Sequence, residues 1–356
     1  TAVAAGTPPD WSIFHAAEVQ QMASQGLMQS MDPIFFETGD LPKDDFSPAI
    51  MDVCTFDGAA MAVPFDNHGW VQYVNTKVIT DAGLDPMALP KNGTEFIDWA
   101  LKVTTDEAGK HANEDGFNPD KTAVWALHQS WPRFTIPSTL FQFGGGVIDA
   151  ANNKSLLDSE QSVAAIQFWH DLMYKYKVVP PQVPGQLSSY DLYKTNALAI
   201  MWDGTWSLGF FNDNPDILPP TSYATSLVSL SPDGHQANKM DSHIMTIPPG
   251  VAAENSERAA KLIKWLSDSG KTWATSGQIP ARLSVQNDPD VQAIWSVKAA
   301  AEQFNAIGVT ETPHKAFIEL QIAWEASVGA ALTNATPVVQ ALQEGSAAVQ
   351  SILDRG

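Results

Sequence analysis

The sequence contains little cysteine and few basic residues. Cys54 is the only cysteine among 356 residues, so an intrachain disulfide and a zinc site built on several cysteines are both excluded. Twenty lysines and arginines face forty acidic residues, a formal net charge of -20. A surface with this charge repels phosphate backbones, and we therefore expect no nucleic-acid partner. No apolar run approaches the roughly 18 residues that a membrane helix needs, so we expect a soluble chain.

Local motifs of common catalytic and cofactor sites are also missing. Gly144-Gly145-Gly146 is not followed by the Lys-Ser/Thr pair of a phosphate-binding loop, and the sequence has no G-x-S-x-G or H-E-x-x-H motif. His15 and Glu18 are three residues apart, which suits one face of a helix, but no third ligand follows nearby. We therefore expect neither a metal nor a cofactor.

One class of enzyme stays open as an alternative. Glycoside hydrolases also use tryptophans and carboxylates, and they need two carboxyl groups about 5–10 Å apart across the scissile bond. Acidic residues are plentiful here, but no local pattern marks a nucleophile beside an acid. The sequence therefore favours a protein that catalyses nothing, with a secreted glycoside hydrolase as the alternative.

The residues that are present indicate a globular protein. Apolar residues make up 44% and charged residues 17% of the chain, and its length predicts two domains or lobes. Tryptophan is frequent, with twelve residues. We expect most of them in the core, including those on predicted helices at positions 99, 169, 265 and 273, and the remainder as stacking platforms for a ring-shaped ligand.

Strand and helix patterns alternate along the chain. Apolar runs predict strands at residues 12–14, 61–64, 71–74, 123–127, 197–202 and 243–247. Helical spacing and caps predict helices at residues 16–25, after Asn92, after Asp158 and at residues 256–268. The last fifth is predicted to be helical, with Thr312-Pro313 and Thr336-Pro337 as helix starts. This alternation predicts an α/β protein with mainly parallel sheets.

The first residues resemble the end of a helix. Thr1 to Gly6 has the composition of a last helical turn with Gly6 at its C′ position, and it lacks the basic and apolar regions of a signal peptide. We expect the native polypeptide to extend about 40–60 residues upstream, enough for a strand–helix–strand unit and an export signal.

A series of short motifs, in order along nearly the whole chain, resembles the extracellular solute-binding proteins for carbohydrates, which are relatives of maltose-binding protein. The motifs are Thr1–Asp10 with Ile13–Glu18, Gln25–Met28, Asp57-Gly58, Val63–His68, Tyr73–Lys77, Phe143–Gly146, Met201–Trp206 and Gly277–Arg282. Two departures stand out. The family's first strand, helix and strand are absent before Thr1, and Val74 replaces a tyrosine of the family pattern.

This resemblance implies the type II periplasmic-binding-protein fold, in which two α/β lobes are joined by three hinge crossings and the C-terminal region is helical. The crossings are expected near Val71, Met245 and Ala281. Lobe 1 would then comprise residues 1–70 and 246–281, without its first strand–helix–strand unit. Lobe 2 would comprise residues 71–245 and 282–356.

The implied function is the capture of a carbohydrate between two closing lobes and its delivery to the transmembrane permease of an ABC importer. The ligand would be a di- or oligosaccharide or a glycoside, and a polyol or glycerol phosphate is the alternative. The resemblance also implies a monomer located in the periplasm or outside the cell, with a lipid anchor upstream of Thr1 as one option.

The resemblance also indicates which residues contact the ligand. Trp206 matches a stacking tryptophan that follows the family's Asp/Asn-Gly-x-Trp turn, and His68 matches a polar contact near the first crossing. Asp66 lies two residues earlier, on the same face of a strand. The remaining candidates are Phe14, His15 and Glu18 at a helix entrance, Trp131 and Arg133 before the triple glycine, and Arg282. For Arg282, a structural ion pair at the hinge is an equal alternative.

Overall fold

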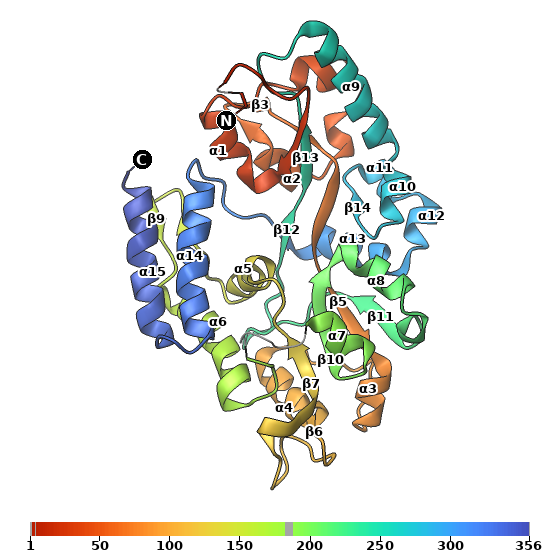
Figure 1. Cartoon of the computed structure of the whole chain (residues 1–356), viewed down its shortest axis with the longest axis vertical. Helices are drawn as coiled ribbons and strands as arrows, with labels where there is room; N and C mark the ends of the chain where they lie inside the picture. The colour runs from red at the N-terminus through yellow and green to blue at the C-terminus, as the bar shows by residue number, and fades with distance from the viewer. Residues whose placement is uncertain (1, 4, 182–187, 356) are drawn as a thin grey trace.

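The computed structural model describes residues 2–3, 5–181 and 188–355. The molecule is elongated and has two parts, each built around its own β-sheet (Figure 1). We call the part around the three-stranded sheet the small-sheet lobe and the part around the eight-stranded sheet the large-sheet lobe. No helix among the described residues is both long and apolar enough to cross a membrane.

The small-sheet lobe is formed by two distant segments of the chain. Its sheet has the order β1-β13-β4, and both pairings are antiparallel. The bounds of its elements are β1 Ser12–His15, α1 Val19–Ser24, α2 Pro48–Val53, β2 Thr55–Phe56, β3 Ala59–Ala60, β4 Val63–Pro64, β13 His243–Thr246 and α9 Ala253–Asp268. Short 3-10 or π turns lie at Ala16–Glu18, Asp32–Phe36 and Lys43–Asp45.

The large-sheet lobe has the strand order β15-β12-β5-β10-β7-β6, with β11 and β14 also paired to β5. Its strands are β5 Asp66–Asn75, β6 Thr105–Asp106, β7 Thr122–His128, β10 Leu198–Gly204, β11 Ser222–Thr225, β12 Asn238–Asp241, β14 Ile279–Pro280 and β15 Gly308–Val309. Strands β8 Ile148–Asp149 and β9 Lys154–Ser155 form a separate ladder.

Helices surround this second sheet. They are α3 Thr76–Asp81, α4 Gly93–Val103, α5 Pro132–Gln142, α6 Glu160–His170, α7 Ser189–Lys194, α8 Leu208–Asn212, α10 Gly270–Ala274, α11 Leu283–Gln286, α12 Pro289–Gln292, α13 Trp295–Ile307, α14 Phe317–Leu332 and α15 Val338–Leu353. Short turns lie at Pro119–Lys121, Asp171–Lys175, Thr205–Ser207 and Pro215–Ile217. Helices α14 and α15 lie side by side next to α5 and α6 (Figure 1).

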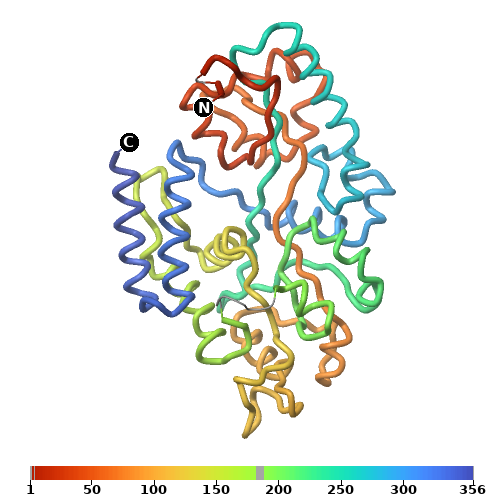
Figure 2. Tube along the Cα trace, viewed as in Figure 1, coloured from red at the N-terminus to blue at the C-terminus, as the bar shows by residue number. Residues whose placement is uncertain are grey.

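The chain passes between the two sheets at defined places, and the tube in Figure 2 shows two of these segments running together along the molecule. Strand β4 ends at Pro64 and β5 begins at Asp66, so the first change of sheet falls at Phe65. The second lies at Ser242, between β12 and β13. The third change of sheet falls between α9 and β14, because β14 already pairs with Asn67 and Asp66 of β5. Just after β14, Arg282 forms a bridge with Phe46. The first two lie a few residues before the predicted positions near Val71 and Met245.

Several sequence predictions agree with these elements. The strands predicted at 12–14, 71–74, 123–127, 197–202 and 243–247 fall within or overlap β1, β5, β7, β10 and β13. Asn92 caps α4 by accepting a hydrogen bond of 2.9 Å from the backbone N–H of Glu95. At the chain start, Gly6 has the left-handed φ of 73° that a C′ residue requires, although the described residues there form turns. Thr1 and Ala4 lie outside the described residues.

Other predictions were wrong. Within the described sheets, β10–β7 and β12–β15 are the parallel pairs and the rest are antiparallel, because apolar runs carry no information on strand direction. Ser159, rather than Asp158, caps α6. The Thr312-Pro313 pair does not start a helix, since α14 begins at Phe317. Trp99 and Trp169 are buried as predicted, but Trp265 is 62% exposed.

Candidate functional site

A cavity of about 680 Å³ lies between the two lobes. Such a volume lies within the usual range of about 300–1,000 Å³ for small-molecule sites. The small-sheet lobe contributes His15 and Glu18 to its wall, and the large-sheet lobe contributes the rest. Those other lining residues are Gln129, Trp131, Pro132, Arg133, Phe134, Trp206, Lys239, Asp241, Phe317, Gln321, Glu325, Val328, Gly329, Leu332 and Thr333.

Trp206 forms one wall of the cavity. It follows β10 in a single 3-10 turn and is half-buried. Its indole packs against Trp70 at 5.7 Å, Phe134 at 6.0 Å and His68 at 6.2 Å between ring centroids. The ring is therefore held in place on one side while its remaining surface borders the cavity, as a stacking platform requires.

Trp131 forms a second aromatic wall. It is 58% exposed and has a φ of 40°, a left-handed conformation that is rare for a bulky residue. Pro132 follows it at the first position of α5, so the strained residue sits at a helix start. The rings of Trp131 and Trp206 are 6.5 Å apart and nearly perpendicular, at 86°. Together they form an aromatic corner, and the strain at an exposed tryptophan is typical of a binding position.

Two carboxylates border the cavity from the first turn of the small-sheet lobe and from β12. Glu18 accepts a hydrogen bond of 3.2 Å from the backbone N–H of His15. Burial and, to a smaller extent, the nearby Asp241 raise the pKa of Glu18. The Oδ1 atom of Asp241 accepts a hydrogen bond of 2.8 Å from the backbone N–H of Ser242. Both carboxylates are placed to accept hydrogen bonds from a ligand in the cavity.

The cations of the cavity are already paired with carboxylates. Arg133 Nε lies 3.2 Å from Glu325 Oε1, and Lys239 forms an ion pair with the buried Glu311. The Lys239 Nζ atom also lies 4.5 Å above the ring of Phe134 and donates to the carbonyl of Arg133 at 3.1 Å. Burial raises the pKa of Glu311, and the Lys239 charge opposes that effect. The positive charges of Arg133 and Lys239 are therefore neutralised by carboxylates of the protein itself.

Asp66 and His68 lie next to the cavity but are fully buried rather than exposed on its wall. Asp66 Oδ1 lies 2.9 Å from His68 Nδ1, and Asp66 Oδ2 lies 2.8 Å from His243 Nδ1. Burial alone would raise the pKa of the Asp66 carboxyl, but the hydrogen bonds from His243 and His68 hold that pKa well below its usual range. Asp66 thus connects histidines of the two lobes.

Of the nine predicted contact residues, the structure brings five together at the cavity: His15, Glu18, Trp131, Arg133 and Trp206. Phe14 does not line the cavity; it is half-buried and packs against the core cluster that contains Val71 and Tyr73. Arg282 is instead bound to Asp45 at 2.7 Å and to Asp268 at 2.8 Å, which is the ion-pair alternative stated for it.

The residues that close the cavity from the C-terminal side carry no recognisable signal in the sequence. Phe317, Gln321 and Glu325 recur at helical spacing on one face of α14 and line the cavity. Lys239 and Asp241 alternate on β12 and lack such a signal as well. The spacing of these residues is visible in the sequence, but nothing local distinguishes a cavity-facing side of a helix from a side that faces another helix.

The comparisons with known proteins agree with this architecture. Residues 1–299 match the family described as bacterial extracellular solute-binding protein, whereas no curated protein matches the chain. A solute-binding protein from Thermotoga lettingae, solved with α-D-tagatose, is 21% identical, with a TM-score of 0.81 over 99% of this chain and 87% of that chain. The maltose-bound MalE3 of T. maritima is 23% identical, with a TM-score of 0.80 over 99% of this chain and 86% of that chain.

A third solved structure carries a different kind of ligand. UgpB from Mycobacterium tuberculosis, in complex with glycerophosphocholine, is 18% identical, with a TM-score of 0.81 over 99% of this chain and 86% of that chain. These likenesses show that the chain has the two-lobed fold of periplasmic binding proteins, as predicted. Because the family match extends over residues 1–299 of 356, the chain belongs to the family of bacterial extracellular solute-binding proteins.

Proposed function

We propose that the chain binds a carbohydrate, a di- or oligosaccharide or a glycoside, in the cavity between its lobes and delivers it to the permease of an ABC importer. The observation that carries this proposal is the perpendicular pair Trp131 and Trp206 beside the carboxylates of Glu18 and Asp241. A sugar ring has an apolar face that stacks on an indole and a rim of hydroxyls that donate to carboxylates. The corner and the carboxylates together match both features.

The charge of the cavity favours a neutral ligand over a phosphate ester. Three carboxylates line it (Glu18, Asp241 and Glu325) against two cations (Arg133 and Lys239), so the lining has a formal net charge of one negative unit. Both cations are paired, as described above. To bind one of these cations, a glycerol phosphate would have to displace Glu325 from Arg133 or Glu311 from Lys239. We therefore rank glycerol phosphate below a sugar as the ligand. Two of the solved relatives in this fold carry tagatose and maltose.

We also propose that binding of the ligand closes the lobes and that the ligand is later released chemically unchanged. In this proposal the chain divides near Phe65, Ser242 and Ala281, acts as a monomer outside the cytoplasmic membrane and has no catalytic activity. The cavity walls belong to both lobes, so a ligand that contacts Glu18 and Trp206 together favours the closed arrangement.

The direct test is a screen of mono-, di- and oligosaccharides, polyols and glycerol 3-phosphate by thermal unfolding, followed by titration calorimetry of the hits. A bound sugar raises the unfolding temperature because it binds the native state alone. We expect one sugar per chain, recovered intact by mass spectrometry after release. Stabilisation by glycerol 3-phosphate alone would support the alternative ligand class, and a hydrolysed oligosaccharide would establish the hydrolase.

A further inference from the structure

We propose that His15, His68 and His243 form a binding site for a single Zn²⁺ ion at the junction of the two lobes. His15 ends β1 and His243 begins β13, and the two are directly opposite each other in the strand register. His68 lies on β5 of the other sheet. The site goes beyond sugar binding and does not depend on it.

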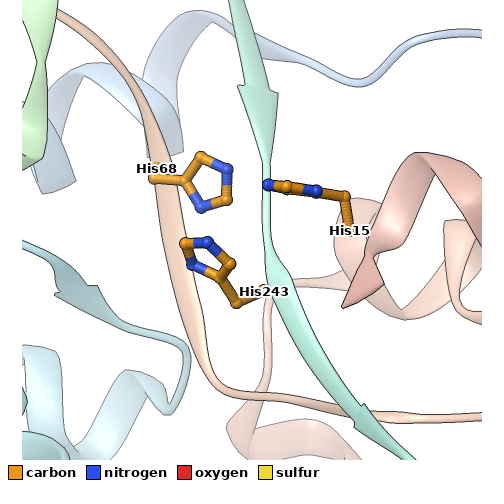
Figure 3. Close-up of side chains that lie close together, drawn as sticks. All are labelled: His15, His68 and His243. Atoms are coloured by element: carbon orange, nitrogen blue, oxygen red, sulfur yellow. The ribbon is translucent and has the colours of Figure 1, made fainter. Parts of the chain in front are cut away.

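The three imidazole rings converge. Their centroids lie 4.4 Å apart for His68 and His243, 5.0 Å for His15 and His243, and 5.4 Å for His15 and His68. Figure 3 shows a ring nitrogen of His15 directed at the other two rings. One nitrogen of each ring can be chosen so that all three lie within 4.8 Å of one another.

Asp66 fixes the proton positions that metal binding requires. Its two oxygens accept from Nδ1 of His68 and of His243 at 2.9 and 2.8 Å. A neutral imidazole that carries its proton on Nδ1 presents a lone pair on Nε2. Metal-bound histidines commonly donate their other ring N–H to a carboxylate in this way. Asp66 is itself held by Trp273 Nε1 at 2.9 Å and by the backbone N–H of His243 at 3.0 Å.

The hydrogen bonds of the cluster leave ring nitrogens available for an ion. Among the described residues, Asp66 engages Nδ1 of His68 and Nδ1 of His243, so neither Nε2 atom is used in these bonds. Protonated rings this close would bring like charges together, whereas a cation between neutral rings would bind their lone pairs. The carboxylates of Asp66 and of Asp241, which lies opposite His68 in the strand register, supply the compensating negative charge.

The geometry suits zinc after a small contraction. Zn²⁺ binds histidine nitrogens at about 2.0–2.1 Å, so the nitrogens of a tetrahedral site lie about 3.3 Å apart. The nitrogens here must therefore approach by at most about 1.5 Å, a movement that side-chain rotation or closure of the lobes can provide. Three imidazoles and no oxygen ligand select zinc-type metals over Mg²⁺ or Ca²⁺. The fourth position of such an ion is left to water or to a ligand in the cavity, whose wall includes His15.

The experiment is a calorimetric titration of Zn²⁺ into the chelator-treated chain without sugar, comparing the wild type with His15→Asn. His15 makes no contact with Asp66, so this change leaves the buried carboxylate paired. The matched control is His235→Asn, since His235 is exposed and lies outside the cluster. We expect one Zn²⁺ per chain for the wild type and the control, and affinity lowered by more than about 100-fold in His15→Asn.

Equal Zn²⁺ affinity in His15→Asn and wild type, or no binding to the wild type, would overturn the proposal. If His15→Asn does not fold, anomalous diffraction from zinc-soaked wild-type crystals decides instead. A zinc peak between the three imidazole rings supports the site, and zinc found only elsewhere refutes it. Because no sugar is present, failure of the zinc site leaves the proposed sugar function untouched, and failure to find a sugar leaves the zinc result unaffected.

Discussion

The indole ring of Trp206 fills the space that a side chain on residue 204 would need. A Cβ atom built on Gly204 would lie 2.1 Å from Cε2 of Trp206. The backbone at Gly204 has a φ of −72°, which any residue adopts, so the requirement for glycine comes from the tryptophan and not from the turn. Gly204 thereby sets the position of an aromatic wall of the cavity.

This relationship predicts the behaviour of Gly204→Ala. The added methyl group has to displace the indole, so we expect at least about tenfold weaker sugar binding and a loss of about 1–3 kcal/mol in the free energy of unfolding. Calorimetry and urea unfolding measure the two effects. In a Trp206→Ala background the clash is absent, and the second substitution should cost much less than in the wild type. An equal loss of stability from Gly204→Ala in the wild type and in the Trp206→Ala variant would contradict this account.

Trp131→Ala separates binding from folding. The side chain is 58% exposed, so its removal should change the free energy of unfolding little, while the loss of a stacking surface should weaken sugar binding by about 2–4 kcal/mol. Trp265→Ala is the matched control, because Trp265 is also exposed, at 62%, but lies on α9 outside the cavity. A Trp131→Ala variant that binds as tightly as the Trp265→Ala variant would exclude stacking on Trp131.

The parts of the fold that follow from neighbouring residues could be predicted from the sequence. Asn92 places the start of α4, because the Glu95 N–H that its side chain caps lies only three residues along the chain. The apolar run at 197–202 identifies β10 in the same way. Trp206 could be assigned to the site because it follows directly after that strand in a recognisable motif.

The parts that depend on distant contacts could not be predicted. Arg133 meets Glu325 across 192 positions, and Asp66 meets His243 across 177. Neither pairing leaves a local pattern, so the α14 wall and the histidine cluster were both missed. His15 and Glu18 alone are too few for a metal site, and no third ligand lies near them in the sequence. The fold supplies His68 and His243 from strands far along the chain.

Closure of the lobes can be measured directly. Glu18 belongs to the small-sheet lobe and Trp206 to the large-sheet lobe, so a sugar that contacts both should hold the lobes together and reduce the radius of gyration. Small-angle scattering with and without saturating sugar measures this change. The double variant Trp131→Ala/Trp206→Ala, at a sugar concentration below its own Kd, should keep the larger radius. An unchanged wild-type radius at saturation would argue for a rigid cavity.

The ion pair between Arg282 and Asp45 predicts a pH-dependent contribution to stability. Burial alone would raise the pKa of Asp45, but hydrogen bonds from Ser284 and Arg282 lower it below its ordinary value. A carboxyl whose pKa is lower in the folded chain stabilises that state above its unfolded pKa of about 3.9, and the contribution disappears as the pH falls through the folded value. The contribution should therefore be complete at pH 7 and should decline as the pH falls below about 3.9.

The test compares Asp45→Asn with the wild type by urea unfolding across this range. We expect the free energy of unfolding of the variant to be lower by about 1–2 kcal/mol at pH 7. This value is at the lower end of the range for hydrogen bonds to charged groups, because Arg282 keeps its second partner Asp268 at 2.8 Å. The difference should shrink as the pH falls below about 3.9. Sugar affinity should stay unchanged, since Arg282 acts on the connection between the lobes and lies outside the described cavity wall. If Asp45→Asn has normal stability but binds sugar more weakly, the structural role given to Arg282 is wrong, and Arg282 would instead be a ligand contact.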